Sequence, residues 1–232
     1  MGMTLEAPLY IYAVCQLPSE GLVLPLGIEQ ETVLVRVADL GAIAEPAIDL
    51  QALQEDDQRL LTAVLTHDRV IAELFQQTTL LPLRFGIQLA GLQSVEIHLR
   101  DNQERYRQRL AALAGKAEYQ IKLTPLDIAL APLPEGLPGR EYFLAKKLRL
   151  QEQAAAQQRQ QDALNYLLSQ IQAAYPNLQA GEPDENGAVR LYLLLSLSGA
   201  ESLLQSVEIW QRQSPYWQLS LSEALPPYHF VG

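Results

Sequence analysis

Cysteine, histidine and tryptophan are scarce in this sequence: its 232 residues include one Cys, three His and two Trp. A single Cys cannot form a disulfide within the chain, and it excludes a metal site built from paired cysteines. The histidines, His67, His98 and His229, are far apart, and none lies four residues from a second ligand. A metal site would have to be assembled from distant segments. We therefore expect no metal and no cofactor.

Basic residues are also few, since 17 Lys and Arg face 27 Asp and Glu and give a formal net charge of −10. This balance disfavours a general nucleic-acid-binding protein, which needs a basic surface. The first apolar run, Leu9–Cys15, is far shorter than the roughly 20 residues that cross a bilayer. No Lys or Arg precedes it, as a secretory signal would require. With 48% hydrophobic residues, the composition predicts a globular cytoplasmic protein that binds neither nucleic acid nor membrane.

The sequence lacks the common catalytic motifs GxxxxGK[ST], GxGxxG after a strand, HExxH and GxSxG. Cys15 with His67 as its base is one catalytic alternative, because the two can meet in space. However, Cys15 ends an apolar strand, where a free thiol behaves as a small hydrophobic group. His67 lies on the apolar face of a helix, three residues after Val64 and four before Ile71. Both positions favour the core over a catalytic site.

Hydrophobic patterning predicts two α+β domains. The first half reads as strands over residues 9–15, 32–37 and 42–44, a helix from Asp49 to Phe75, an extended piece over 78–85, and a helix over 95–113 closed by Gly115. The second half reads as a strand over 117–124, a helix over 140–175, a weak strand over 177–180, a strand over 189–197, a helix begun by the capping box Ser198–Glu201, and a strand over 217–221. This second order, βαββαβ, is ferredoxin-like. The predicted boundaries are an N-terminal mixed α+β sheet domain over 3–115, a ferredoxin-like domain over 116–225, and a tail over 226–232 that packs on the body.

The long helix is unusual, because residues 151–161 contain no large apolar side chain. A helix of about 36 residues would be roughly 54 Å long at 1.5 Å per residue, which exceeds the width of a small domain. We therefore expect part of it to be exposed or to lie across the other domain.

The helix begun by the capping box is predicted to carry a buried stripe of Leu203, Leu204, Val207 and Trp210.

Three short segments contain charged or aromatic residues that packing of a core alone does not require. Residues 80–86 place Arg84 in an apolar run, where it is either paired with a buried carboxylate or presented to a partner. Residues 139–143 open the long helix with a charge pair beside two aromatics, and residues 226–230 put two aromatics after a stiff Pro-Pro. The candidate partner-binding or interdomain residues are His67, Arg84, Phe85, Arg140, Glu141, Tyr142, Tyr228 and Phe230.

These segments carry a resemblance to a known family. The matching pieces are LYIYAV at 9–14, DLGAI at 39–43, HDRV at 67–70, LPLRFG at 81–86, YQIKL at 119–123, GREY at 139–142 and PPYHF at 226–230. In this order they resemble the gas vesicle protein F/L family (GvpF/GvpL). The resemblance implies a non-enzymatic accessory protein of gas vesicle assembly, with two α+β domains, the second ferredoxin-like. It also implies contact with the small hydrophobic shell protein and with other gas vesicle accessory proteins. It transfers no catalytic residue.

Two hypotheses remain from the sequence. In the first, the chain binds the shell subunit, whose apolar faces need shielding from water before assembly. The contact would use apolar and aromatic surface, or strand pairing at an open sheet edge. In the second, the chain is a small-molecule-binding protein or enzyme that uses an interdomain groove, with Arg84, His67 and Arg140 as its polar groups.

Overall fold

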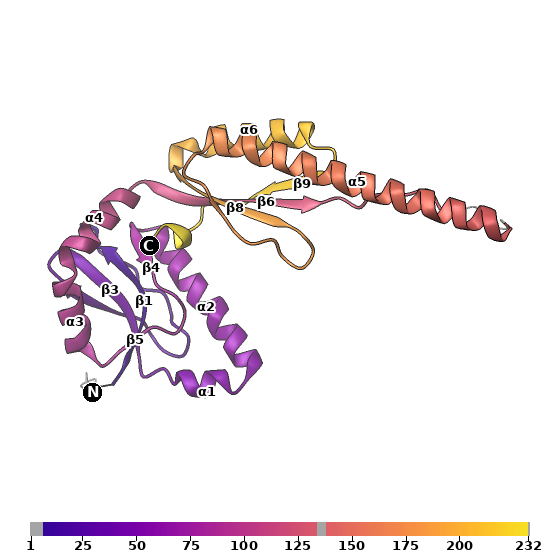
Figure 1. Cartoon of the computed structure of the whole chain (residues 1–232). Helices are drawn as coiled ribbons and strands as arrows, with labels where there is room; N and C mark the ends of the chain where they lie inside the picture. Colours follow the sequence, from indigo (N-terminus) through magenta and orange to yellow (C-terminus); the bar gives the residue numbers. More distant parts are fainter. Residues whose placement is uncertain (1–6, 134–137, 232) are drawn as a thin grey trace. The chain divides into compact units, whose positions relative to one another are not determined.

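The computed structural model describes residues 7–133 and 138–231. The chain is a mixed α+β protein with two sheets and, in these residues, six α-helices (Figure 1). It divides into two compact units. The first unit comprises Met1–Glu118 together with Ala224–Gly232, and the second comprises Tyr119–Glu223. The chain therefore leaves the first unit and returns to it at its C-terminal end.

The sheet of the first unit is built around its first strand. Its strands are β1 (Leu9–Gln16), β2 (Val33–Val37), β3 (Leu40–Pro46), β4 (Leu80–Pro82) and β5 (Gln88–Leu89). They run in the order β2-β3-β1-β4, with β5 also pairing with β1, and all these pairs are antiparallel. Every residue of β1 from Leu9 to Cys15 is buried, because both faces of the sheet are covered. A strand covered on both faces reads as a continuous apolar run rather than an alternating one.

The two helices predicted for the first half are each divided in the structure. The first becomes α1 (Leu50–Gln54) and α2 (Asp57–Phe75), and the second becomes α3 (Leu92–Asp101) and α4 (Gln103–Leu113). Asp56 separates α1 from α2, since its extended backbone and its carboxylate cap the N–H groups of Gln58 and Arg59. An Asp side chain at this position stabilises a new helix start rather than a continuing helix. Asn102 divides the second pair.

The second unit contains β6 (Lys116–Pro125), whose first residues belong to the first unit, and β7 (Gln179–Ala180), β8 (Val189–Ser196) and β9 (Trp217–Leu221). Their order is β7-β8-β6-β9. Helices α5 (Gly139–Ala174) and α6 (Ala200–Gln213) lie over one face of this sheet (Figure 1). On β8 the side chains alternate, with Val189, Leu191 and Leu193 buried. The weak strand predicted over 177–180 is present as the two residues of β7.

The predicted capping box is wrong. Helix α6 starts at Ala200, after a 3₁₀ turn over Leu197–Gly199, and its N-cap is Gly199 without a side-chain hydrogen bond. The 3₁₀ turn leads directly into the helix, so Ser198 lies inside this turn and not at the cap. The predicted stripe of α6 also needs one correction, because Leu204 is 48% exposed while Leu203 and Trp210 are buried.

Helix α5 packs against the sheet along its second half only. Its buried residues are Ala156, Leu164, Leu167 and Ile171. We call residues 139–155, which precede the first buried residue, the free part of α5; none of them is buried. In Figure 1 this part extends beyond the sheet of its own unit. Ala, Gln and Glu are good helix formers, so the helix persists there without burial.

Candidate partner-binding surfaces

The predicted site residues belong to two groups in different units. The first unit holds His67, Arg84, Phe85, Tyr228 and Phe230, and the second holds Arg140, Glu141 and Tyr142. Each group is described by itself below.

His67 lies inside the first unit and is 2% exposed. Its Nε2 lies 3.1 Å from the carbonyl oxygen of Leu83, and its Nδ1 lies 2.7 Å from the hydroxyl of Tyr10. Since a carbonyl only accepts, Nε2 carries the proton and Nδ1 accepts the Tyr10 hydroxyl proton. Burial lowers the pKa of His67, so the neutral ring is favoured. Both nitrogens are occupied, and His67 serves the core.

Cys15 is also a core residue, with no exposed surface. Burial raises the pKa of its thiol to about 12. A nucleophilic cysteine needs the opposite, a thiolate near neutral pH. The structure therefore gives no support to a Cys15–His67 pair. Within residues 7–133 and 138–231, no group of three His, Cys, Asp or Glu side chains is placed to hold a metal ion.

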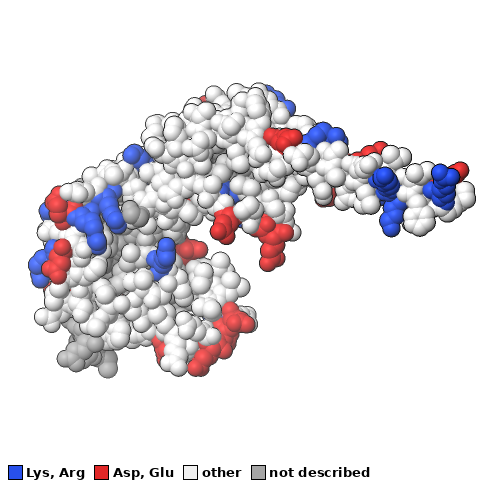
Figure 2. Space-filling view, viewed as in Figure 1, with Lys and Arg blue, Asp and Glu red and all other residues white. Residues whose placement is uncertain are grey.

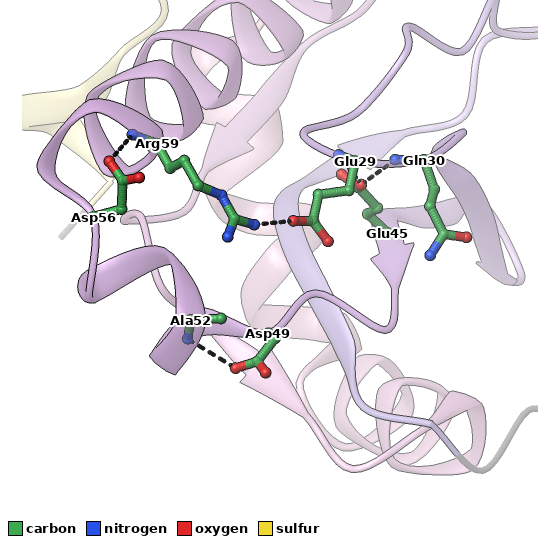
Figure 3. A network of polar contacts seen from close by, with 7 residues as sticks. All are labelled: Glu29, Gln30, Glu45, Asp49, Ala52, Asp56 and Arg59. Atoms are coloured by element: carbon green, nitrogen blue, oxygen red, sulfur yellow. Dashed lines mark hydrogen bonds and ion pairs between the residues drawn. The ribbon is translucent and has the colours of Figure 1, made fainter.

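A buried carboxylate that the sequence did not single out organises the loop between β1 and β2. Glu45 has no exposed surface. Its oxygens accept hydrogen bonds from the backbone N–H groups of Ile28, Glu29 and Gln30, each 2.6 Å long, and from the hydroxyl of Tyr12. Figure 3 shows Glu45 beside Glu29 and Gln30. These donors satisfy the buried charge, as a carboxylate in the core requires. Glu45 therefore fixes this loop to the sheet and leaves no open coordination for a ligand.

Gly27 explains how the loop approaches Glu45 so closely. A Cβ built at Gly27 would overlap the Glu45 carboxylate and lie 2.8 Å from the carbonyl oxygen of Gln30. Only glycine fits between these two groups. Beside them, Arg59 at the start of α2 forms an ion pair with Glu29 at 3.1 Å (Figure 3).

Arg84 and Phe85 follow β4 and point in different ways. The Phe85 ring packs edge-on against Tyr10 and His67, with centroids 5.8 and 5.7 Å apart. Arg84 is exposed, and none of the described residues forms an ion pair with it. Two roles were expected for Arg84, and the structure does not show the first of them, an ion pair with a buried carboxylate. Arg84 is presented to solvent, next to a turn at Gly86 (φ 92°).

The C-terminal tail is held on the first unit by polar contacts. Leu225 and Glu118 exchange both backbone hydrogen bonds, at 2.8 and 2.9 Å. The Glu118 carboxylate, in a residue that is 1% exposed, accepts the backbone N–H of His229 (2.8 Å) and lies 2.7 Å from the Nδ1 atom of its ring. Arg109 donates to the carbonyl oxygen of Val231 at 2.9 Å. These contacts extend from the start of the tail to its end.

Tyr228 and Phe230 are both half-buried, and Tyr228 packs against the aromatic and aliphatic core of the first unit. Burial, and then the nearby Asp68, raise the pKa of Tyr228. The hydroxyl lies 3.4 Å from the Asp68 carboxylate. The tail thus contributes an aromatic side chain to the core in addition to its polar contacts.

The free part of α5 exposes the densest set of apolar side chains along the described chain. Tyr142 is 41% exposed, and larger fractions are exposed at Phe143 (71%), Leu144 (55%), Leu148 (59%) and Leu150 (59%). The sequence placed Arg140, Glu141 and Tyr142 here as candidates, and the structure leaves all three exposed. Phe143 was noted only as one of the two aromatics of residues 139–143, and Leu144, Leu148 and Leu150 were missed, because a hydrophobic residue in a helical pattern counts toward the core by default.

The same helix segment is basic in an acidic chain. Its four basic residues are Arg140, Lys146, Lys147 and Arg149, and its two acidic residues are Glu141 and Glu152. Lys and Arg side chains gather on this part of the surface (Figure 2). None of the four takes part in an ion pair with another described residue. Their charges are therefore not neutralised locally.

One edge of the second unit's sheet is partly covered by a side chain. Strand β9 is at the end of the strand order, so the backbone groups on its outer side have no neighbouring strand. The carboxamide of Gln211 on α6 takes that place, since it accepts the Leu219 N–H at 2.7 Å and donates to the Trp217 carbonyl at 3.0 Å. Covering an edge in this way discourages pairing with another chain.

Comparisons with known proteins identify the family. The model of the gas vesicle synthesis protein GvpL/GvpF family matches residues 8–232. The chain belongs to this family. Membership of the GvpL/GvpF family connects the chain with gas vesicle formation.

Similar proteins support the same assignment. Gas vesicle protein F of Streptomyces sp. (strain CB03234) is 29% identical over 213 residues, which cover 85% of this chain and 87% of that protein. The crystal structure of GvpF from Anabaena sp. PCC7120 matches with a TM-score of 0.71 at 16% identity, over 97% of this chain and 96% of that one. GvpF from Microcystis aeruginosa matches with a TM-score of 0.68 at 18% identity, over 97% and 99% of the two chains. The two structures show that this GvpL/GvpF member has the GvpF fold.

In this GvpL/GvpF member, no helix of the described ranges combines the length and the apolar character needed to cross a membrane.

Proposed function

We propose that the chain is an accessory protein of gas vesicle formation that binds the small hydrophobic shell protein during assembly, through the free part of α5. The observation that carries the proposal is the exposure of Phe143, Leu144, Leu148 and Leu150 on a helix segment in which no residue is buried. Contiguous exposed apolar surface on a folded protein marks an interaction site.

The dimensions and chemistry of the segment suit such a partner. Its 17 residues extend over about 25 Å at 1.5 Å per residue. Phe143 and Tyr142 are aromatic side chains with ring centroids 6.1 Å apart, and aromatic residues are enriched at protein interfaces. A shell subunit that lines a gas-filled compartment carries large apolar faces, which such a helix covers during assembly. The rest of the chain is acidic, which keeps the complex dispersed.

Within the second unit, a helical contact is favoured over strand pairing. The edge strand β9 is already bonded by Gln211, and β7 at the other edge has two residues. We place the chain in the cytoplasm, on or beside the gas vesicle, with the shell protein and other gas vesicle accessory proteins as its partners. Neither nucleic acid nor membrane is part of this proposal.

We assign no catalytic step to the chain. The alternative of an enzyme or small-molecule-binding protein needed His67, Arg84 and Arg140 as groups of one groove. His67 is buried with both ring nitrogens bonded, and Arg84 is exposed on the surface of the same unit. These two side chains do not offer a shared polar pocket.

We also infer that the second unit is ferredoxin-like. Its elements follow the chain order β6-α5-β7-β8-α6-β9, and its strands lie in the spatial order β7-β8-β6-β9. This combination supports the split βαβ arrangement. The fold places α5 and α6 on one face and lets α5 continue beyond the sheet.

The proposal is tested by capture of the shell subunit on the tagged full chain. We compare the double variant Phe143→Gln/Leu148→Gln with the control Leu61→Gln/Leu65→Gln on α2, where the leucines are 60% and 61% exposed. Gln keeps helix propensity in both. Binding should fall at least tenfold in the α5 variant and stay within twofold in the control. Equal binding by all three proteins, or no binding by the unchanged chain, would contradict the proposal.

A further inference from the structure

Four of the exposed apolar side chains of the free part of α5, Phe143, Leu144, Leu148 and Leu150, share one side of the helix, whereas Tyr142 lies on the opposite side. In an α-helix, residues four, seven and eleven positions apart lie on the same face. Two neighbouring stripes follow this spacing. They consist of Phe143, Lys147, Leu150 and Ala154, and of Leu144, Leu148, Gln151 and Ala155. All eight residues are exposed. Together they form what we call the outer face of α5.

The outer face points away from the side by which α5 packs on its sheet. At 100° per residue, the buried Leu164, Leu167 and Ile171 lie roughly 140° around the helix axis from the centre of the outer face. A second helix can therefore lie along the outer face without contacting the sheet of the second unit. This makes the outer face accessible over its whole length.

Charge decides what kind of helix fits there. Arg140 and Lys147 lie in line with the outer face, Lys146 borders it beside Leu150, and Glu141 borders the opposite edge beside Leu148. Two copies of this chain that paired through their outer faces would bring these like charges together, which disfavours self-association. A partner with Asp or Glu beside an apolar stripe would pair with the same lysines, while the lysine stems add apolar contact.

We infer that the outer face of α5 binds an acidic amphipathic helix of the shell subunit. This inference rests on the proposed function and specifies the chemistry of its partner segment. Apolar contact at Phe143, Leu148 and Leu150 holds the two helices together. The basic residues select an acidic partner and set the register, as charged positions beside an apolar stripe do between paired helices.

The test uses charge reversal in the full chain. The variant Lys146→Glu/Lys147→Glu is compared with Lys116→Glu/Arg159→Glu, a control with the same charge change at two exposed positions outside the free part of α5. Affinity for the purified shell subunit is measured at 50 mM and 500 mM NaCl. We expect the α5 variant to bind at least tenfold more weakly at 50 mM salt and the control to stay within twofold of the unchanged chain. High salt should reduce the difference, because it screens exposed charges.

The possible outcomes separate the two proposals. If the unchanged chain does not bind the shell subunit, the proposed function fails and this inference fails with it. If the unchanged chain binds and the α5 charge variant binds equally well at both salt concentrations, the inference alone is overturned. A dimer of the chain alone that dissociates in Phe143→Gln would also overturn it, since the outer face would then belong to a second copy. Circular dichroism of both variants should show unchanged helix content.

Discussion

Replacing Glu45 by Gln should strongly destabilise the first unit. The carboxylate accepts three backbone N–H groups at 2.6 Å and the Tyr12 hydroxyl. The pKa of Tyr12 is raised by burial and then by its hydrogen bond to Glu45, so this hydroxyl remains a donor. A glutamine offers one acceptor oxygen and a donating NH₂ group. In either orientation of the glutamine side-chain amide, its NH₂ group faces N–H or O–H donors that bond to the Glu45 carboxylate in the unchanged protein.

The size of the effect follows from these contacts. If the amide oxygen keeps the N–H groups of Glu29 and Gln30, each bond loses about 1 kcal/mol, the difference between a charged and a neutral acceptor. The Ile28 N–H then faces the amide nitrogen, which costs about 1–3 kcal/mol more. The total is about 3–5 kcal/mol. For a unit of this size it lowers the melting temperature on the order of 10 °C.

The measurement is thermal unfolding of the full chain, followed by circular dichroism and calorimetry. Glu73→Gln is the matched control, because Glu73 forms an exposed ion pair with Arg69 on α2. Such pairs contribute less than about 1 kcal/mol, so its melting temperature should change little. A Glu45→Gln protein that melts within about 2 °C of the unchanged chain would refute the role assigned to this carboxylate.

Three further changes have defined outcomes. Burial lowers the pKa of His67 below its ordinary value of 6.5, so below that pH the unfolded chain binds more protons than the folded chain. The free energy of unfolding should therefore decrease as the pH falls below 6.5. Measuring the unfolding free energy across acidic pH checks this, and the His67→Gln variant should lose less stability on acidification. Deleting residues 226–232 should lower the melting temperature by several degrees, since it removes a core aromatic and exposes Glu118; an unchanged melting temperature would contradict the docking of the tail. Gln211→Ala should cost about 1–2 kcal/mol by freeing the Leu219 N–H, and light scattering should detect more self-association; a variant that stays monomeric and fully stable would count against edge protection.

Much of the fold could be predicted because burial leaves a direct pattern in the sequence. The apolar run from Leu9 to Cys15 corresponds to the fully buried part of β1, and the long helix predicted over 140–175 is α5 (Gly139–Ala174). The breaks at Asp56 and Asn102 were missed, since an apolar stripe continues with nearly the same period across a short interruption. At Asp56 a single capping carboxylate outweighs the periodicity.

The site was less predictable than the fold. In the sequence, Glu45 comes directly after the strand predicted over 42–44, and nothing identifies a partner for its side chain. Its donors at Ile28, Glu29 and Gln30 are backbone N–H groups, which leave no mark in the sequence. Only the end of the free part of α5 left a signal, because residues 151–155 belong to the run 151–161 that lacks large apolar side chains. That signal predicted exposure of the helix but not that Phe143 would be exposed with it. Burial of such a residue depends on whether a sheet lies beneath it.

Hydrogen exchange of the full chain, with and without the purified shell subunit, tests the central claim most directly. The backbone amides of residues 139–155 lie in a helix segment in which no residue is buried, so they should exchange quickly in the free chain. Binding should slow their exchange at least tenfold and leave α2 and the tail unchanged. Protection confined to the first unit, with residues 139–155 exchanging as in the free chain, would contradict the claim that α5 is the surface that binds the shell.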